Sequence, residues 1–359
     1  MRILHVIPKL EIGGAQGLLE NVLPLISDTY DISVVVYRKT GSVIEKNLEK
    51  KGIPVYSLEA SPRSPKAITR LRRYLKSADL IHFHLFPTQY YGILSNIGIN
   101  KPIIFTEHST FNKRRNHKFL KPIEKIIYKK FLKIVCISEP VRNSLAEWLS
   151  ENGDNSKFTV IENGINLSRF ENTKAPSRKE LFGREGTPLL MISRFTDSKD
   201  HETVVKTLLY LKNPDIYVVF VGEGENRKKT EELAERLGVR EKIIFLGERK
   251  DIPEIIKAAE IGIQSSNWEG FGLSAIEMMA GGIPVVASDV EGLNAIINDK
   301  DLLFRKGDAV DLAYKIDRLL SDSKLYSEKV KKGKETVGKF SIDKTAKKYI
   351  DLYSEIFNS

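Results

Sequence analysis

The chain has 359 residues, of which 41% are hydrophobic and 29% charged, with a single cysteine and a formal net charge of +10. This length predicts about two globular domains, and the composition excludes an intrinsically disordered chain. Because Cys136 has no partner for an intramolecular disulfide and no apolar stretch is long enough to span a bilayer, we expect a cytoplasmic protein.

Strands alternate with helical segments through the first half of the chain. Short apolar stretches bounded by turn residues predict strands, and longer segments with helical periodicity predict helices between them. This alternation is typical of βαβ units and a parallel sheet. The strands are predicted at 2–8, 32–38, 80–85, 102–108 and 133–138. The helices are predicted at 15–27, 42–51, 65–77, 87–96, 118–131 and 139–150.

The alternation pauses over 163–183, a polar segment with Gly and Pro that we interpret as a linker, and then resumes. Strands are predicted next at 188–194, 215–224, 242–247, 261–266 and 283–288, with helices at 200–211, 226–238, 251–259 and over most of 308–357. We therefore predict an α/β protein with two doubly wound, Rossmann-like domains. Ligands of such sheets bind beyond the carboxyl ends of the strands, so we expect the two domains to face each other across a cleft at those ends. The expected division is 1–168, 169–340 and a final helix, 341–359, that packs back on the first domain.

The segment EGFGLSAIE places two carboxylates at a strand-to-helix junction. Glu269 follows a predicted strand, and Glu277 lies in the next helix, about two turns on from Glu269. A carboxylate can accept hydrogen bonds from two neighbouring sugar hydroxyls, and the N–H groups of a helix's first turn attract phosphate. Ordinary surface acids on a helix are the alternative. We disfavour it because the surrounding aromatic and aliphatic residues predict a mostly buried site, where an unpaired carboxylate is costly.

Two further strand ends suit an anion. In SRFTDSKDHET (193–203), Arg194 and Lys199 provide a planar fork and a compact charge for a diphosphate, and solvated surface charge is the alternative interpretation. In IPKLEIGGAQ (7–16), Gly14 lets the backbone approach an anion at a helix start, although a simple turn explains this motif equally well.

Two glycine turns also close strands. They are VGEGEN (221–226), with Gly222, and FLGERKDI (245–252), with Arg249. Each of these motifs can be interpreted either as a loop that contacts a ligand or as an ordinary turn at the end of a strand. The glycine pair of the first loop is not G-x-G-x-x-G, so the nicotinamide dinucleotide fingerprint is absent.

Together, and in this order, the motifs resemble those of the retaining nucleotide-sugar glycosyltransferases of glycosyltransferase family 4, which have the GT-B architecture. EGFGLSAIE is similar to the family's E-x7-E signature, GGAQ to its N-terminal glycine loop, SRFTDSKD to its Arg/Lys diphosphate clamp, and ENGIN to the segment ahead of its interdomain linker. The family commonly has an acid directly after the glycine loop, whereas this chain has Gln16.

The resemblance implies a role for each matched residue. Arg194 and Lys199 would neutralise the donor diphosphate and stabilise it as it leaves, and Glu277 would bind the ribose hydroxyls. Glu269 would hold the donor sugar, and His108, in FTEHST, would contact it as well; without this context a lone histidine is more often structural. The other donor contacts expected are Gly14, Gly222, Arg249 and the backbone at Phe271, Gly272 and Leu273.

The expected chemistry follows from charge. Cleaving a sugar–diphosphate bond develops negative charge on the leaving group, and fixed donors aimed at its oxygens lower that barrier. Because cationic side chains take the place of a metal, we expect no essential divalent ion and no cofactor besides the nucleotide diphosphate sugar as donor substrate. No enzymic nucleophile is obvious. The family's usual account is front-side attack by the acceptor, with the departing phosphate helping to take its proton.

The positive charge is concentrated in one half of the chain. Residues 1–170 hold 26 Lys and Arg against 15 Asp and Glu, whereas residues 171–359 hold 31 against 32. The segment 112–133 has nine Lys and Arg and one Glu, and 61–76 has six and none. In the first of these segments Leu120, Ile123, Ile127 and Phe131 recur at helical spacing, and Lys121, Lys125 and Lys129 lie on another face.

A basic amphipathic helix is typical of proteins that bind anionic membrane surfaces. We expect the apolar stripe to pack on the sheet and the three lysines to meet lipid, whereas a purely solvated helix face is the alternative. Nucleic acid is a less favoured partner, because no basic motif with interleaved aromatic residues is present.

These observations predict a retaining glycosyltransferase that moves a hexose or N-acetylhexosamine from a nucleotide diphosphate sugar, with UDP-sugars favoured from the family. The expected acceptor is a membrane-associated or lipid-linked glycan for surface polysaccharide, and the expected location is the inner face of the cell membrane. One alternative is a nucleotide-sugar epimerase of the same fold. Another is a non-catalytic basic protein that binds membranes or nucleic acid.

Overall fold

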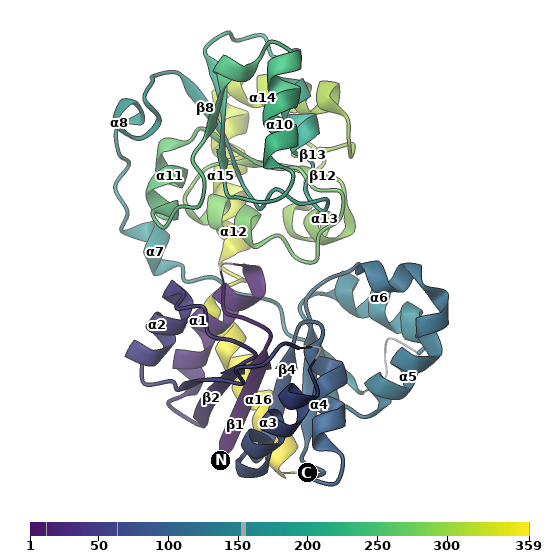
Figure 1. Ribbon diagram of the computed structural model, residues 1–359. Helices are drawn as coiled ribbons and strands as arrows, with labels where there is room; N and C mark the ends of the chain where they lie inside the picture. The colour runs from purple at the N-terminus through teal and green to yellow at the C-terminus, as the bar shows by residue number, and fades with distance from the viewer. Residues whose placement is uncertain (12, 63, 152–155, 359) are drawn as a thin grey trace. The chain divides into compact units, whose positions relative to one another are not determined.

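The computed structural model describes residues 1–11, 13–62, 64–151 and 156–358. The chain divides into two compact units (Figure 1). Unit 1 comprises Met1–Gly164 together with Ile342–Ser359, and unit 2 comprises Ile165–Ser341. Each unit is a parallel sheet with helices packed against it, which is the α/β class predicted from the alternating pattern.

Within the described residues, unit 1 has a seven-stranded sheet in the order β3-β2-β1-β4-β5-β6-β7, with all neighbouring strands parallel. Every residue of β4 and β5 is buried, which is expected for central strands of a sheet covered on both faces. The strands are β1 (Arg2–Ile7), β2 (Asp31–Val36), β3 (Val55–Ser57), β4 (Leu80–His84), β5 (Ile103–Glu107), β6 (Lys133–Cys136) and β7 (Phe158–Val160).

The last helix of the chain, α16 (Ile342–Asn358), lies beside α1 in unit 1 (Figure 1). Tyr349 and Tyr353 of α16 share one apolar core with α1, α2 and the strands β1 and β2. The remaining helices of unit 1 are α1 (Gly14–Ile26), α2 (Val43–Lys50), α3 (Pro65–Ser77), α4 (Thr88–Asn96), η1 (Lys113–Asn116), η2 (Lys118–Leu120), α5 (Lys121–Lys129) and α6 (Glu139–Leu149).

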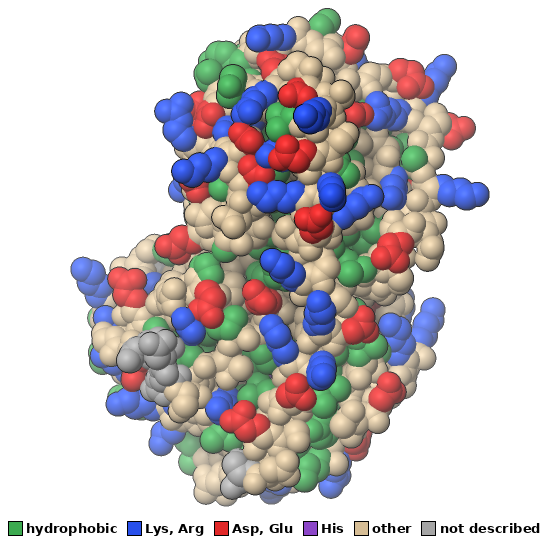
Figure 2. All heavy atoms as spheres, turned by 180° about the vertical axis from the view of Figure 1, so that it is seen from behind, with side chains coloured by type: hydrophobic (Ala, Val, Ile, Leu, Met, Phe, Trp, Pro, Cys, Tyr) green, Lys and Arg blue, Asp and Glu red, His purple; other side chains and the backbone are tan. Residues whose placement is uncertain are grey.

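In unit 2 the described residues form a six-stranded parallel sheet in the order β10-β9-β8-β11-β12-β13. On the face seen in Figure 2, unit 2, in the upper part of the view, carries basic and acidic side chains interspersed, in line with its nearly balanced charge. Its strands are β8 (Thr187–Ile192), β9 (Ile216–Val221), β10 (Ile243–Phe245), β11 (Ile261–Gln264), β12 (Val285–Ser288) and β13 (Leu303–Phe304).

The helices of unit 2 are α7 (Ser168–Glu171), α8 (Arg178–Phe182), α9 (His201–Thr207), α10 (Arg227–Arg236), η3 (Arg240–Lys242), α11 (Ile252–Ala258), α12 (Leu273–Ala280), α13 (Glu291–Ile297), α14 (Ala309–Ser321) and α15 (Ser323–Val337). Two of them, α7 and α8, lie within 163–183, the polar segment that we interpreted as a linker. Phe170 of α7 and Phe182 of α8 are buried, and these two aromatic side chains fix the short helices on unit 2.

Each sheet contains one point at which the strand order reverses. In unit 1 this switch point lies between β1 and β4, and in unit 2 it lies between β8 and β11. Loops that leave neighbouring strands at such a point diverge to opposite sides of the sheet, which opens a crevice at the carboxyl ends of the strands. The loops after β1, β4, β8 and β11 are therefore the places to look for ligand-binding residues.

The basic helix of the first half is oriented differently from the sequence prediction. Phe131, just after α5, is buried, but Ile123 is 49% exposed and Ile126 is 64% exposed. The inward residues of α5 are Glu124 and Tyr128, both at most 2% exposed. The prediction that Ile123 packs on the sheet is therefore wrong, because a polar network around Glu124 takes that place.

The network around Glu124 explains this orientation. Its carboxylate accepts hydrogen bonds from the hydroxyl of Tyr90 and the indole Nε1 of Trp148, both at 2.5 Å, and forms an ion pair with Arg114 at 2.9 Å. A buried carboxylate with several partners of this kind is favourable where an unpaired one is not. No helix in the described part of the chain has the length and apolar character required to cross a bilayer.

Candidate functional site

The candidate site of unit 2 lies at its switch point, where two loops are joined by backbone hydrogen bonds. The amide of Asp200 donates to the carbonyl of Ser265 at 3.1 Å, and the amide of Asn267 donates to the carbonyl of Ser198 at 2.8 Å. The loop after β8 is thereby fixed to the loop after β11. This contact brings together Lys199 and Glu269, which are 70 residues apart in the sequence.

Lys199 and Glu269 form an ion pair, and both side chains are 16% exposed. Three weaker polar contacts surround it: the Lys199 ammonium donates to Ser266 Oγ at 3.4 Å, the Gln264 amide donates to the Glu269 carboxylate at 3.4 Å, and Ser266 Oγ donates to it at 3.5 Å. The backbone N–H of Gly270 also donates to Glu269 at 3.2 Å. The ammonium is therefore held in one place at the carboxyl edge of the sheet.

Glycines allow the backbone segments to approach closely here. Gly222, after β9, has φ +134°, and a Cβ on it would lie 2.2 Å from the carbonyl oxygen of Ser193. Only glycine adopts this conformation without strain, so Gly222 lets the loop after β9 pack on the loop that carries Arg194. The backbone of Gly222 therefore helps to set the shape of the site.

The helix α12 begins directly beside Glu269. Its N-cap is Gly272, with φ +93°, and no side chain among the described residues caps its first turn. A Cβ on Gly292 would lie 2.3 Å from the carbonyl oxygen of Glu269, so the helix α13 also packs tightly on this loop. The N–H of Ala275 already donates to the carbonyl of Gly272 at 3.0 Å, so the first-turn N–H groups that could meet an anion such as phosphate are those of Leu273 and Ser274.

Glu277 lies on α12 about one turn from its N-terminus and is half-buried. Burial raises the pKa of its carboxyl to about 7, and the positive charge of Arg169 on α7 opposes that shift. A carboxyl with a raised pKa in a site of this kind is a functional candidate, because an ordinary surface acid would be well solvated.

The other predicted residues of unit 2 differ in their surroundings. Arg194 is exposed on the loop after β8. Phe271 is buried with its ring edge-on to Phe340, at 5.4 Å between centroids, so its side chain is structural and its backbone remains the candidate contact. Arg249 forms an ion pair with Asp251, two residues along the chain, and its Nε donates to that carboxylate at 2.8 Å. Its charge is therefore already balanced by a local partner.

Unit 1 carries the remaining two predicted residues. Gly14 is the first residue of α1 and is exposed, and no side chain of the described residues caps that helix start. His108 follows β5 and is half-buried, and burial lowers the pKa of its imidazole to about 4. A neutral imidazole has one N–H and one lone pair, so His108 is suited to hydrogen bonding with a hydroxyl.

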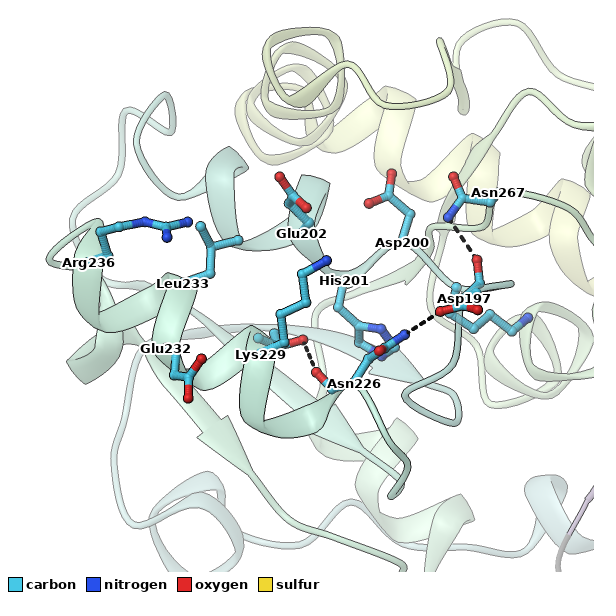
Figure 3. Close-up of a pocket in the computed structure, with 12 residues that line it drawn as sticks. Asp197, Asp200, His201, Glu202, Asn226, Lys229, Glu232, Leu233, Arg236 and Asn267 are labelled. Atoms are coloured by element: carbon cyan, nitrogen blue, oxygen red, sulfur yellow. Dashed lines mark hydrogen bonds between the residues drawn. The ribbon is translucent and has the colours of Figure 1, made fainter.

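A cavity of about 340 Å³ lies in unit 2, lined mainly by residues of α9, α10 and the loop after β8 (Figure 3). It shares Lys199 with the candidate site, but Arg194, Glu269 and Glu277 do not line it. Its rim mixes acids and bases, so its charge does not favour a diphosphate as clearly as the switch point does. The lining residues are Asp197, Lys199, Asp200, His201, Glu202, Asn226, Lys229, Thr230, Glu232, Leu233, Arg236 and Asn267.

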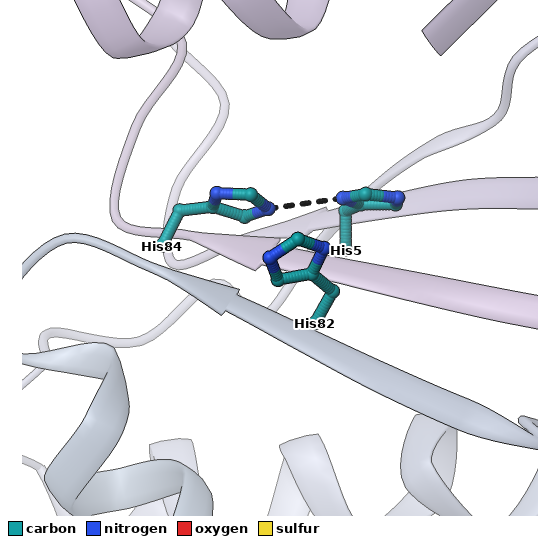
Figure 4. A group of neighbouring side chains, drawn as sticks. All are labelled: His5, His82 and His84. Carbon is teal, nitrogen blue, oxygen red and sulfur yellow. Dashed lines mark hydrogen bonds between the residues drawn. The ribbon is translucent and has the colours of Figure 1, made fainter. Parts of the chain in front are cut away.

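Sequence reasoning missed a group of three histidines in unit 1. One nitrogen from each of His5, His82 and His84 lies within 4.8 Å of the others, so the group is a candidate for metal binding by its residue types (Figure 4). Both nitrogens of His82 are already hydrogen-bonded, to Tyr353 at 2.7 Å and to Thr106 at 2.6 Å. The signal in the sequence was H-x-H on a strand, a spacing that puts both rings on one face of the sheet.

Comparisons with known proteins agree with this architecture. The family model described as "Glycosyltransferase Family 4" matches residues 12–169, and the model "Glycosyl transferases group 1" matches residues 173–336. "Putative glycosyltransferase EpsD" of Bacillus subtilis is 25% identical over 327 residues, which are 85% of this chain and 84% of that protein.

Two further proteins show the same similarity. The Escherichia coli protein "UDP-Gal:alpha-D-GlcNAc-diphosphoundecaprenol alpha-1,3-galactosyltransferase" is 25% identical over 313 residues, 81% of this chain and 79% of its own. Anabaena HepE, solved in complex with UDP and glucose, superposes with a TM-score of 0.89 at 18% identity, covering 99% of this chain and all of the other. Since the two family models match both halves of the chain and the structural relatives share its two parallel sheets, this protein belongs to glycosyltransferase family 4 and has the GT-B fold.

Proposed function

We propose that the protein is a retaining glycosyltransferase that transfers a hexose or N-acetylhexosamine from a UDP-sugar to a lipid-linked glycan at the inner face of a membrane. The observation that carries this proposal is the meeting of Lys199, Glu269 and the first turn of α12 at the switch point of unit 2. A fixed cation and free amide groups at one sheet edge suit a diphosphate.

In this proposal the donor diphosphate binds at the N-terminus of α12. Its oxygens accept hydrogen bonds from the Lys199 ammonium and from the N–H groups of the helix start, and the Arg194 guanidinium adds a second positive charge. Charge on the leaving diphosphate grows as the sugar bond breaks, so these donors bind the transition state more strongly than the ground state. Glu269 keeps Lys199 in place before the donor arrives.

Glu277 is proposed to bind the ribose. An ionised carboxylate accepts hydrogen bonds from two vicinal hydroxyls, and the backbone of the turns at Gly222 and Arg249 would line the space for the base. A uridine donor is supported by the UDP named with Anabaena HepE and by the UDP-galactose in the name of the Escherichia coli relative. Gly14 and His108 remain the predicted contacts of unit 1 to the donor phosphate and the transferred sugar.

The retaining outcome is proposed from the family resemblance, with attack by the acceptor on the face that the diphosphate leaves. The departing phosphate then takes the acceptor's proton, and the sugar–oxygen bond that forms replaces the one that breaks. Because Lys199, Arg194 and the α12 amides supply positive charge to the leaving group, we propose that this step needs no divalent metal.

The acceptor class is proposed from the α5 surface, which we define as Phe119, Ile123 and Ile126 with the flanking Lys118, Lys129 and Lys130. Phe119 is 70% exposed, and the two isoleucines are 49% and 64% exposed. Exposed apolar side chains with lysines beside them are suited to the interface of an anionic bilayer, because the apolar groups can enter the lipid while the lysines bind its headgroups. Lys121 and Lys125, half-buried beside this surface, complete the basic face that the sequence indicated.

A transfer assay tests the proposal directly. The purified chain is incubated with a panel of UDP- and GDP-sugars, with and without a lipid-linked acceptor, and products are identified by mass spectrometry. Transfer that needs both substrates and retains the anomeric configuration is expected. Conversion of a donor without acceptor would indicate an epimerase instead, and failure of every nucleotide sugar to bind would indicate a non-catalytic protein.

A further inference from the structure

The two cations of the candidate site lie on one loop, residues 193–201, which we call the cation loop. It leaves the carboxyl end of β8 and ends at the first residue of α9. Arg194 lies next to one end of this loop, and Lys199 lies two residues from the other end. A diphosphate meets both charges at once only if the two ends of the loop keep a fixed separation.

Separate backbone contacts hold each end of the cation loop. At its start, the amide of Ser193 donates to the carbonyl of Val221 at 2.9 Å. The amide of Phe195 donates to the carbonyl of Glu223 at 3.1 Å. The far end is joined to the loop after β11 through the two backbone hydrogen bonds of the candidate site. The two ends are therefore tied to β9 and β11, which lie on opposite sides of β8 in the sheet.

A side-chain contact joins the two ends of the cation loop directly. The Oγ of Ser193 lies 2.9 Å from the Nε2 of His201, which is hydrogen-bond distance. His201 is 3% exposed, and its ring stacks on Phe195 with 3.9 Å between centroids and 14° between ring planes. The ring of Phe220 on β9 meets His201 edge-on at 5.2 Å. These aromatic contacts hold the imidazole with its Nε2 at the Ser193 hydroxyl.

His201 makes this contact as an uncharged ring. Burial, and to a smaller extent the charge of Lys199, lowers the pKa of its imidazole to about 3. A hydroxyl can donate or accept, so Ser193 pairs with the Nε2 of a neutral imidazole in either tautomer. The contact therefore does not depend on the tautomer of His201, and it places no further charge beside Lys199.

We propose that Ser193 and His201 are positioning residues, which fix the separation of Arg194 and Lys199 so that both cations reach one diphosphate. Holding the cations in place before the donor binds avoids the entropy cost of ordering them at that moment. This inference rests on the proposed function for the binding of the diphosphate. The closure of the cation loop is itself a property of unit 2 and holds without any ligand.

Hydrogen exchange tests this closure without any activity. Amide exchange of the segment 193–201 is followed by mass spectrometry in the ligand-free full chain. Ser193→Ala, which removes only the hydroxyl, is expected to speed exchange of this segment roughly fivefold, because one tie between the ends of the loop is lost.

The matched control for hydrogen exchange is Thr207→Val. It removes a buried hydroxyl of α9 whose partner is the carbonyl of Thr203 within the same helix, and it should leave exchange of the cation loop unchanged. Wild-type exchange in Ser193→Ala, or an equal increase in Thr207→Val, would overturn the proposal.

Kinetics then tests the positioning role. Ser193→Ala and His201→Leu are each expected to lower kcat/KM for a UDP-sugar roughly fivefold, the effect of about one hydrogen bond. His201→Gln places an amide group where the Nε2 was, so it is expected to recover most of that loss. In an Arg194→Ala background the separation of two cations no longer matters, so Ser193→Ala should have no further effect there. A fivefold loss that persists in this background would assign the effect to packing and contradict the positioning role.

The outcomes separate this inference from the proposed function. If the wild-type protein transfers no sugar, the proposed function fails, while hydrogen exchange still decides the closure of the loop. Calorimetric affinity for UDP then replaces kcat/KM, and an affinity unchanged by Ser193→Ala would overturn the positioning role. If transfer occurs and Ser193→Ala keeps the wild-type kcat/KM, the positioning role is wrong and the proposed function stands.

Discussion

The two units share the doubly wound strand order, with seven strands in one sheet and six in the other, but the groups at their switch points differ in charge. Unit 2 places an ion pair, Lys199–Glu269, and an uncapped helix start at the edge between β8 and β11. Unit 1 places neutral imidazoles at the edge between β1 and β4, with His5 and His84 fully buried. One edge therefore suits charged phosphate, and the other suits uncharged hydroxyl groups.

Partly burying a charged side chain costs desolvation energy, and this cost is offset where the charge can bind a charged ligand. A cation held by a carboxylate in a half-buried site remains available to a diphosphate, which carries more charge than the carboxylate can neutralise. Unit 1 does bury charge as well, but away from its switch point, in the network around Glu124 below α5. We therefore expect charge to act on stability in unit 1 and on catalysis in unit 2.

The largest expected effect is on the stability of unit 1. Glu124→Ala would take the ion-pair partner from Arg114, which is 17% exposed, and the shared acceptor from Tyr90 and Trp148. Breaking a buried pair of this kind costs about 3–5 kcal/mol, which urea unfolding followed by circular dichroism would measure. Glu124→Gln, which keeps the shape and one acceptor, should lose less. An unfolding free energy unchanged by Glu124→Ala would contradict the structural role of this charge.

Lys199→Ala is expected to give the largest effect on catalysis. It removes the cation from the donor site and the ion-pair partner of Glu269, and the loss of one transition-state donor lowers kcat by about 10²–10³. Steady-state kinetics with a UDP-sugar measures this change. The control is Lys229→Ala, at the neighbouring cavity, which should keep the wild-type rate. A similar loss in both variants would place the diphosphate in the cavity instead.

Membrane binding should depend on unit 1 alone. Reversing the charge of Lys121, Lys125 and Lys129 to Glu removes at least three favourable interactions of about 1 kcal/mol each, so affinity for anionic vesicles should fall by roughly a hundredfold or more. Sedimentation with phosphatidylglycerol vesicles measures it. Reversal of Lys324, Lys331 and Lys339 in unit 2 is the matched control. Equal losses in the two triple variants would show that only net charge matters and would remove the membrane role of α5.

The smallest expected effect is the pH dependence of Glu277. Because burial raises the pKa of its carboxyl to about 7 from the model-compound value of 4.5, the group stabilises the fold at low pH, and this contribution is lost as the pH rises through 7. Over the same interval the carboxylate becomes able to accept two ribose hydroxyls. Affinity for UDP-glucose, whose diphosphate has no free terminal phosphate, should rise about tenfold from pH 6 to pH 8.

Calorimetric titration at both pH values measures that rise, and Glu277→Gln supplies its control. The glutamine variant should bind UDP-glucose with an affinity that is the same at pH 6 and pH 8. A pH-dependent rise that persists in Glu277→Gln would assign the titration to another group and would leave the ribose-binding role of Glu277 without support.

The sequence predicted the long elements and missed several of the short ones. The strands β3, β7 and β13 have three, three and two residues. Runs this short carry no measurable periodicity, although each of these strands pairs with the strand that precedes it in the chain. The same limit applies to α7 and α8, of four and five residues, which lie where we interpreted 163–183 as a linker.

The sequence identified the residues of the candidate site, but it could not predict which of them contact one another. The motifs identified Lys199 and Glu269 separately, but their ion pair depends on two loops meeting across β8 and β11, which no local pattern encodes. The orientation of α5 was wrong for a related reason. Periodicity alone favoured Ile123 as the inward residue, whereas the partners that make Glu124 the inward residue come from η1, α4 and α6.

The most direct test of the account is a crystal structure of the chain with UDP. We predict that the diphosphate lies at the N-terminus of α12, with its oxygens within hydrogen-bond distance of the Lys199 ammonium and the amides of Gly272 and Leu273, and with the ribose at Glu277. A diphosphate bound instead in the cavity lined by Lys229 and Arg236, or a ribose with no contact to Glu277, would contradict the central claim.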